Sequence, residues 1–126
     1  MRIGFLSYDF FPPKGGQGVE AFNLYKRLSG DFGVDTKTIS ACRNHINGHI
    51  SIPVKDNTRT PALRFSLKVN NGLKKLVSSL GLDLLQIYGG PGGVMLLRDP
   101  GIPVIYVANH TYMQQRMYLR LSLIHI

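Results

Sequence analysis

Short apolar runs alternate with segments of helical periodicity along most of this chain. The first run, residues 2–8, carries Ile3 and Phe5 on one face and Leu6 and Tyr8 on the other, as expected for a central strand of a parallel sheet. Further runs predict strands at 35–40, 50–54, 83–88 and 104–108. A proline in the third of these runs, Pro53, predicts an edge strand or a strand end.

Helical periodicity predicts four helices, at 19–28, 61–80, 94–98 and 113–121. The longest begins with Pro61 after a capping Thr60, is stopped by Gly81, and has a weak point at Gly72. Its expected core face is Phe65, Val69, Leu73, Leu76 and Leu80. The first helix is expected to bury Val19, Phe22, Leu24, Tyr25 and Leu28.

The resulting element order is β-α-β-β-α-β-α-β-α. Helices that alternate with short apolar strands predict an α/β fold, a Rossmann-like three-layer domain with a mostly parallel sheet. The 126 residues fit one domain, and no internal boundary interrupts the pattern.

Composition adds a strong positive charge to this picture. The 15 Lys and Arg against 7 Asp and Glu leave a net charge of +8, which suits a phosphorylated substrate, anionic lipid or nucleic acid. No nucleic-acid motif accompanies the charge, so no nucleic acid is expected. The single cysteine, Cys42, and the lack of a leader or membrane-span pattern predict a cytoplasmic protein.

The loop after the first strand reads Pro12-Pro-Lys-Gly15-Gly16-Gln17-Gly18 and precedes a helix. A strand, a glycine-rich loop and a helix N-terminus form a phosphate cradle, because backbone N–H groups and the helix dipole face the ligand. Residues 16–21 also match a loose dinucleotide fingerprint, but about seven residues precede the first glycine and no acidic residue follows the second strand. A plain connection with positive φ is the alternative.

A second glycine loop, residues 89–93, and the turn at 109–112 follow the fourth and fifth strands. If the first and fourth strands are neighbours, these segments and the first loop line one cleft. His110 could then hydrogen-bond a sugar hydroxyl or act as acid or base; the alternatives are a packed histidine and a simple tight turn. The remaining candidate residues of this cleft are Tyr8, Asp9, Tyr88, Gly89, Gly90, Asn109, Thr111 and Tyr112.

The other polar clusters have simpler interpretations. His45 and His49 lack a third ligand, so no metal site is expected. A basic face on the long helix is either solvated or a contact for an anionic membrane surface. It consists of Arg64, Lys68, Lys74 and Lys75.

Three motifs together resemble the N-terminal domain of retaining GT-B glycosyltransferases of the family-4 type. The motifs are Met1-Arg-Ile-Gly-Phe-Leu-Ser-Tyr-Asp-Phe-Phe-Pro-Pro-Lys-Gly-Gly16, Asp83-Leu-Leu-Gln-Ile-Tyr88 and Pro103-Val-Ile-Tyr-Val-Ala-Asn-His-Thr-Tyr112. The resemblance implies an acceptor-binding domain that faces a second domain across a cleft. A nucleotide-sugar would be the donor substrate, with no cofactor or metal.

The resemblance also implies roles for single residues. Gly15, Gly16 and Gln17 would approach the donor diphosphate, and His110 would contact the transferred sugar. The acceptor side would be shaped by Tyr8, Asp9, Thr111 and Tyr112. The family's donor-binding domain has no counterpart in the sequence, so we expect residues 1–120 to be half of an enzyme, inactive alone, and 121–126 to be a truncated or non-native tail.

Two other functions remain open at this point. One is a non-enzymatic Rossmann-like module that binds a phosphorylated ligand or an anionic membrane, at the inner face of the cell membrane. The other is a dinucleotide-dependent oxidoreductase.

Overall fold

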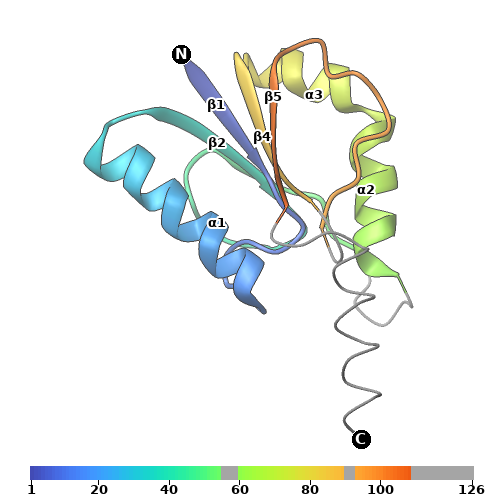
Figure 1. The fold of residues 1–126 in the computed structure, drawn as a ribbon, viewed down its shortest axis with the longest axis horizontal. Helices are drawn as coiled ribbons and strands as arrows, with labels where there is room; N and C mark the ends of the chain where they lie inside the picture. Colours follow the sequence, from blue (N-terminus) through green and yellow to red (C-terminus); the bar gives the residue numbers. More distant parts are fainter. Residues whose placement is uncertain (55–59, 90–92, 109–126) are drawn as a thin grey trace, which may run out of the picture.

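The computed structural model describes residues 1–54, 60–89 and 93–108. Five parallel strands form one sheet, and helices cover both of its faces (Figure 1), which confirms the predicted α/β, Rossmann-like three-layer fold. The elements are β1 (Arg2–Leu6), α1 (Gly16–Lys26), a π-helical turn η1 (Arg27–Asp31), β2 (Asp35–Ser40), β3 (His49–Ser51), α2 (Pro61–Asn71), α3 (Leu73–Leu80), β4 (Leu84–Gly89) and β5 (Val104–Ala108).

The strand order is β3-β2-β1-β4-β5, so the first and fourth strands are neighbours, as the predicted cleft requires. In the register, Phe5 of β1 lies between Thr38 of β2 and Gln86 of β4. The last residue of β5, Ala108, pairs with Gly89, the last residue of β4. The carboxyl ends of these strands therefore meet at one edge of the sheet.

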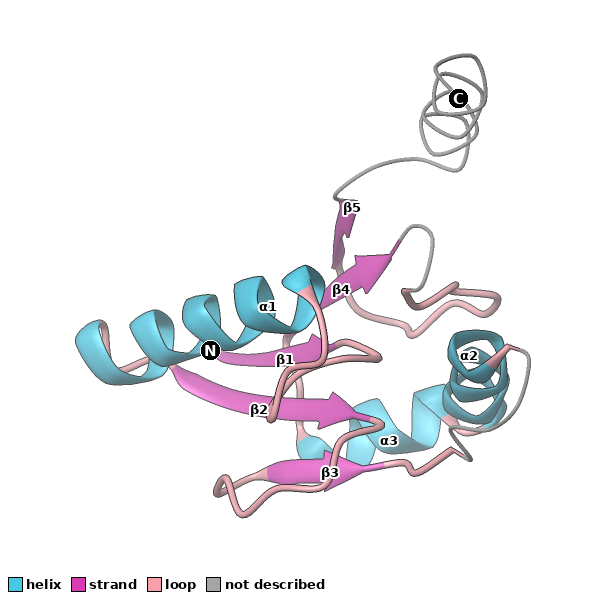
Figure 2. Ribbon diagram, turned by 90° about the horizontal axis from the view of Figure 1, so that it is seen from below, coloured by secondary structure: helices cyan, strands magenta, loops and turns pink. Residues whose placement is uncertain are grey.

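The sheet has a separate apolar core on each face. Figure 2 shows α1 on one side of the strands and α2 with α3 on the other. Because successive strand residues alternate between faces, Phe5 packs toward α1 while Leu6 packs toward α2 and α3. Both side chains are at most 1% exposed, and burial of each contributes about 1.5–3 kcal/mol.

Helix α1 begins three residues earlier than predicted, and the side of the helix that it buries differs from the expected one. Val19, expected in the core, is 46% exposed, while Ala21 is fully buried and Gly18 also faces inward. Small residues at positions 18 and 21 lie on one side of the helix and allow a close approach to the rest of the domain. Phe22, Leu24, Tyr25 and Leu28 pack around that contact as predicted.

The predicted long helix is broken into α2 and α3 at Gly72. There the backbone has φ −130° and ψ 26°, which is outside the helical region. The expected core face is nevertheless correct, because Phe65, Val69 and Leu73 are all buried in one cluster. Gly81 ends α3 in the left-handed conformation, φ 64°, as predicted.

The segment 94–98 is not the helix that its sequence predicts. Two buried polar side chains of α2 hold its backbone instead. Ser66 Oγ accepts a hydrogen bond from the N–H of Met95 (3.0 Å), and Asn70 Nδ2 donates to the Met95 carbonyl (2.8 Å). Asn70 Oδ1 accepts from the N–H groups of Leu97 (2.7 Å) and of the next residue (3.1 Å). These bonds replace those that a helix would have formed within the segment.

The third strand is shorter than predicted and lies at the edge of the sheet. It covers His49–Ser51 rather than 50–54, and Pro53 follows it, consistent with a strand end. The connection from β2, residues 41–48, packs Ile46 into the cluster on the α1 face. A parallel pairing of β2 and β3 is possible because this connection returns over that face.

We predict that Asn70→Ala lowers the free energy of unfolding by about 2–4 kcal/mol, because it removes one buried hydrogen bond within α2 and leaves three partly buried backbone groups of 95–98 without this partner. The matched control is Asn71→Ala, since Asn71 is the next residue and is exposed, and it should change stability by less than about 0.5 kcal/mol. Urea unfolding of both variants measures the difference, and equal stabilities would contradict the assignment.

Candidate functional site

The strand order reverses direction between β1 and β4. From β1 the chain moves outward through β2 to β3, whereas from β4 it moves outward to β5 on the other side. In sheets of this kind, ligands bind beyond the carboxyl ends of the strands at such a reversal. The candidate site therefore lies where the loops after β1 and β4 meet.

The carboxylate of Asp9 organises the loop after β1. One of its oxygens, Oδ2, accepts a hydrogen bond from the Gly15 N–H (2.8 Å), and both oxygens lie near the Lys14 N–H (3.0 and 3.1 Å). The Ser7 hydroxyl donates to the Asp9 carbonyl. Asp9 is only 9% exposed, so these bonds form in a partly desolvated place and fix the loop in front of α1.

Gly15 and Gly16 form the exposed outer side of the α1 N-terminus. Gly15 is the N-cap residue, with φ −153°, an extended conformation open to any residue, and Gly16 does not have a positive φ. A Cβ at Gly16 would meet nothing within 4 Å, and one at Gly15 would meet only an Asp9 oxygen at 3.8 Å. Within the part of the chain that the structure describes, neither position needs glycine for folding.

Gly18 has the opposite character. It is buried, and a Cβ there would lie 2.4 Å from Asp9 Oδ2. Real Cβ atoms do not approach other atoms so closely, so Gly18 makes room for the Asp9 carboxylate. Gly18 therefore packs against the carboxylate that holds the predicted phosphate loop, and it does not face outward with Gly15 and Gly16.

Gln17 joins the two glycine loops. Its side-chain Nε2 donates a hydrogen bond to the carbonyl of Gly89 at the end of β4 (3.1 Å). The bond therefore crosses the reversal point and joins the first turn of α1 to the end of β4. Gln17 is half-buried, so its side-chain amide positions the loops, while its backbone belongs to the first turn of α1.

The glycines after β4 are required by packing within the protein. A Cβ at Gly89 would lie 1.8 Å from the Tyr106 hydroxyl, and one at Gly93 would lie 2.7 Å from the Tyr88 carbonyl. These two glycines therefore allow parts of the protein to approach each other closely. Gly90 lies outside the described residues.

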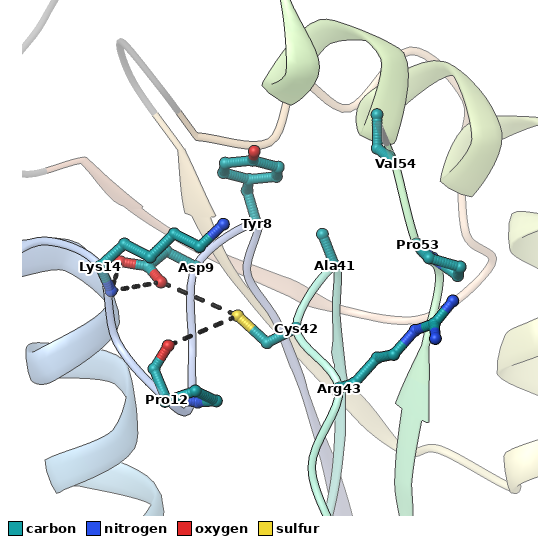
Figure 3. Close-up of a pocket in the computed structure, with 9 residues that line it drawn as sticks. All are labelled: Tyr8, Asp9, Pro12, Lys14, Ala41, Cys42, Arg43, Pro53 and Val54. Carbon is teal, nitrogen blue, oxygen red and sulfur yellow. Dashed lines mark hydrogen bonds between the residues drawn. The ribbon is translucent and has the colours of Figure 1, made fainter. Parts of the chain in front are cut away.

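A cavity of about 340 Å³ opens beside the first loop, on the β1–β2–β3 half of the edge (Figure 3). Tyr8 and Asp9 line it, as predicted for the acceptor side. Lys14, Cys42 and Arg43 were not predicted as site residues, yet all three line the cavity. The remaining walls are Pro12, Ala41, Pro53 and Val54. Cys42 and Arg43 reach the cavity because residues 41–43 follow β2, which pairs with β1.

A polar cluster beneath the cavity fixes Cys42. The Cys42 N–H donates to Ser40 Oγ (3.1 Å), and its carbonyl accepts from Ser51 Oγ (2.6 Å) and His49 Nε2 (3.1 Å). Because a carbonyl can only accept, Nε2 carries the imidazole proton and Nδ1 accepts from the Thr38 hydroxyl (2.6 Å). Burial lowers the pKa of His49 below 6.5, which favours this neutral form.

Tyr88 does not belong to the surface of the site, contrary to the prediction. Its side chain is 1% exposed and packs in the core on the α1 face, where its hydroxyl accepts a hydrogen bond from Gln86 Nε2 (3.0 Å). Burial raises the pKa of Tyr88 above its ordinary value of 10.0. The alternation along β4 explains the error, because position 88 points into the sheet face and not toward the edge.

Four predicted residues lie outside the described part of the chain: Asn109, His110, Thr111 and Tyr112. The backbone that leads to them ends at Ala108, beside Gly89. Their roles as catalytic and acceptor-side residues stay predictions.

The predicted basic face is divided between two helices. Arg64 and Lys68 lie on α2, and Lys74 and Lys75 lie on α3, because the helix breaks at Gly72. All four residues are exposed. The Lys68 ammonium donates to the Pro53 carbonyl (2.9 Å) and so ties α2 to the segment after β3.

Among residues 1–54, 60–89 and 93–108, no group of three or more His, Cys, Asp or Glu side chains is placed to hold a metal ion. Within the same residues, none of the helices has the length and apolar character needed to cross a membrane.

Comparison with known proteins leaves the chain without an assigned family. No family model, curated protein or solved structure matches it. The function must therefore be argued from the site itself.

We predict opposite outcomes for two alanine substitutions in the first turn of α1. Gly18→Ala should lower the free energy of unfolding by about 1–3 kcal/mol, because the new methyl group collides with Asp9. Gly16→Ala should leave stability unchanged or raise it by up to about 1 kcal/mol, because alanine is the better helix former. Chemical unfolding monitored by circular dichroism measures both, and a destabilised Gly16→Ala protein would show that the fold itself needs this glycine.

Proposed function

We propose that this chain is the acceptor-side domain of a retaining, GT-B-type glycosyltransferase that moves a sugar from a nucleotide-sugar donor to an acceptor. One observation carries the proposal. Gly15 and Gly16 are exposed at the reversal point of the sheet, although neither backbone conformation nor packing requires glycine there. A ligand that must come close to the backbone supplies the missing reason for glycine.

The chemistry of the first loop suits a leaving diphosphate. As the bond to the sugar breaks, negative charge grows on the diphosphate. The N–H groups and the positive dipole end of α1 would stabilise that charge without reorganising. Asp9 occupies the inner side of this helix end and leaves the outer side, at Gly15 and Gly16, for the donor. The nucleotide-sugar is a substrate, and the proposal requires no metal or other cofactor.

The remaining parts of the catalytic site follow from the same proposal. In this proposal the cavity beside Tyr8 and Asp9 is the acceptor site. The roles that the resemblance implies for His110, Thr111 and Tyr112 stay predictions, because these residues lie outside the described part of the chain. A second, donor-binding domain is the partner that closes the cleft. The single cysteine suits a reducing compartment, and we place the enzyme in the cytoplasm.

A contact with an anionic membrane is a second candidate function, and one observation favours it. Leu67 and Leu97 are 52% and 55% exposed and line one hollow together with Lys68 and Arg98. Apolar side chains with a basic rim suit insertion at an anionic lipid surface. Flotation of the chain with anionic but not neutral vesicles, lost in Leu67→Ser, would support this function. Equal flotation with both vesicle types would refute it.

The transferase proposal predicts a second nucleotide-binding domain in the gene that encodes this chain. The protein with both domains should transfer sugar from one of a panel of nucleotide-sugars, whereas the 126 residues alone should turn over none. In the two-domain protein, Gly16→Ala should lower kcat/KM by about 10- to 100-fold, because the new methyl group displaces the diphosphate.

Gly30→Ala is the matched control. Gly30 is also exposed, and a Cβ there also meets nothing within 4 Å, but it lies in η1, away from the first loop. Its activity should equal that of the unmodified enzyme. A Gly16→Ala enzyme with full activity, or turnover by the 126 residues alone, would contradict the proposal.

A further inference from the structure

The helices on one face of the sheet carry charge of a single sign. Every charged side chain of α2 and α3 is a lysine or an arginine, and all of them are exposed: Arg64, Lys68, Lys74 and Lys75. Lys74 and Lys75 lie in the first turn of α3, where the positive end of the helix dipole disfavours a cation. Because exposed protein surfaces usually mix both signs, this basic face favours an anionic partner.

Exposed leucines lie beside the basic face. Leu63 and Leu67 are one turn apart on α2, and they are 45% and 52% exposed. Leu97 is 55% exposed, its N–H donates to Asn70 Oδ1 of α2 (2.7 Å), and it lines one hollow together with Leu67. We call Leu63, Leu67 and Leu97 the apolar stripe. An anionic bilayer offers acyl chains to these leucines and headgroups to the cations, whereas the phosphates of a nucleic acid match only the cations.

Helix α2 also supports the cavity beside the first loop. The Phe65 ring meets the Tyr8 ring edge-on, with 5.8 Å between the ring centroids. The Lys68 ammonium donates a hydrogen bond to the Pro53 carbonyl (2.9 Å). Tyr8 and Pro53 both line the cavity (Figure 3). One helix therefore joins the surface that carries the apolar stripe to the cavity.

The cavity suits the headgroup of a lipid better than its acyl chains. Its volume of about 340 Å³ is close to the lower limit of roughly 300 Å³ for small-molecule sites. Its walls combine apolar surface, from Tyr8 and Val54, with the polar side chains of Asp9 and Arg43. Sugars and polyols present the same mixture of carbon and hydroxyl groups. A headgroup that enters the cavity can leave its acyl chains in a bilayer beside α2.

We infer that the acceptor is a membrane lipid with a hydroxyl group in its headgroup, and that the apolar stripe and the basic face lie on an anionic bilayer while the cavity receives that headgroup. The inference rests on the proposed function, since it names the class of acceptor. In the transfer, the headgroup oxygen forms the new bond to the sugar as the bond between the sugar and the diphosphate breaks. The hydroxyl proton passes to the departing diphosphate.

Cys42 gives the test a local readout, because it is the single cysteine of the chain, is half-buried and lines the cavity. Its alkylation by iodoacetamide, an uncharged reagent, is followed by mass spectrometry of the whole chain. The probe is a vesicle of phosphatidylglycerol and phosphatidylcholine, because the phosphatidylglycerol headgroup carries both a negative charge and hydroxyl groups. At a lipid concentration of ten times Kd, these vesicles should slow alkylation by about tenfold.

Vesicles of phosphatidylcholine alone, and soluble glycerol 3-phosphate at the concentration of the phosphatidylglycerol, should not protect Cys42. Leu67→Ser should weaken vesicle binding by about tenfold, because it removes a leucine from the apolar stripe, and so reduce the protection to about twofold. Val19→Ser is the matched control and should keep the full protection. Val19 is 46% exposed and lies on α1, on the opposite face of the sheet. Each variant is compared with its own alkylation rate without vesicles.

Protection by the phosphatidylglycerol vesicles that falls in Leu67→Ser and persists in Val19→Ser supports the inference. The inference is overturned if the chain does not float with these vesicles, if it floats but Cys42 is not protected, or if soluble glycerol 3-phosphate protects equally. The outcome is separable from the proposed function. Protection without sugar transfer by the two-domain protein would leave the lipid site standing and refute the transferase. Transfer to soluble acceptors without protection would do the reverse.

Discussion

The carboxylate of Asp9 fixes the geometry on which the candidate site depends. It holds the N–H groups of Lys14 and Gly15, and it occupies the space that the missing side chain of Gly18 leaves. These contacts set where α1 begins and which of its sides faces the sheet. As a consequence, Gly15 and Gly16 face outward, and Lys14 reaches the cavity. One buried acceptor therefore positions both the helix end and the cavity wall.

The glycines of the two loops divide into two kinds. A Cβ at Gly18, Gly89 or Gly93 would lie less than 3 Å from protein atoms, so a side chain at any of them would force neighbouring atoms to shift. Gly15 and Gly16 are not required in this way. The two kinds of glycine look the same in the sequence, because both belong to glycine-rich loops. Only the space around each position in the structure distinguishes a glycine that serves packing from one that leaves room for a ligand.

Much of the fold could be predicted because the strands are short apolar runs between polar turns. β2 and β5 were predicted at their observed bounds, and the inward face of Phe65, Val69 and Leu73 followed from helical spacing. The segment 94–98 could not be predicted locally, because its backbone is held by Ser66 and Asn70, at least 25 positions away in the chain.

The site was only partly predictable for a similar reason. The glycine loop is visible in the sequence, but the rotation of α1 is not. Helix α1 has many apolar positions, so its sequence is compatible with more than one buried face. The contact between Asp9 and Gly18 selects one of these faces. Val19 lies outside the selected face, which is why its burial was predicted wrongly. Cys42 and Arg43 were missed because their segment is polar and irregular. Their place beside Tyr8 depends on the pairing of β1 with β2, which a single segment does not reveal.

The transferase proposal requires a ligand that contacts Gly15 and Gly16 at the edge of the sheet. The most direct measurement is a nuclear magnetic resonance titration of the ¹⁵N-labelled chain with a nucleotide-sugar. We expect the amide signals of Gly15, Gly16 and Gln17 to move with ligand concentration, while those of Asp35 and Asp83, at the opposite edge, stay in place. Signals that move only at the opposite edge, or none that move at Gly15 and Gly16, would contradict it.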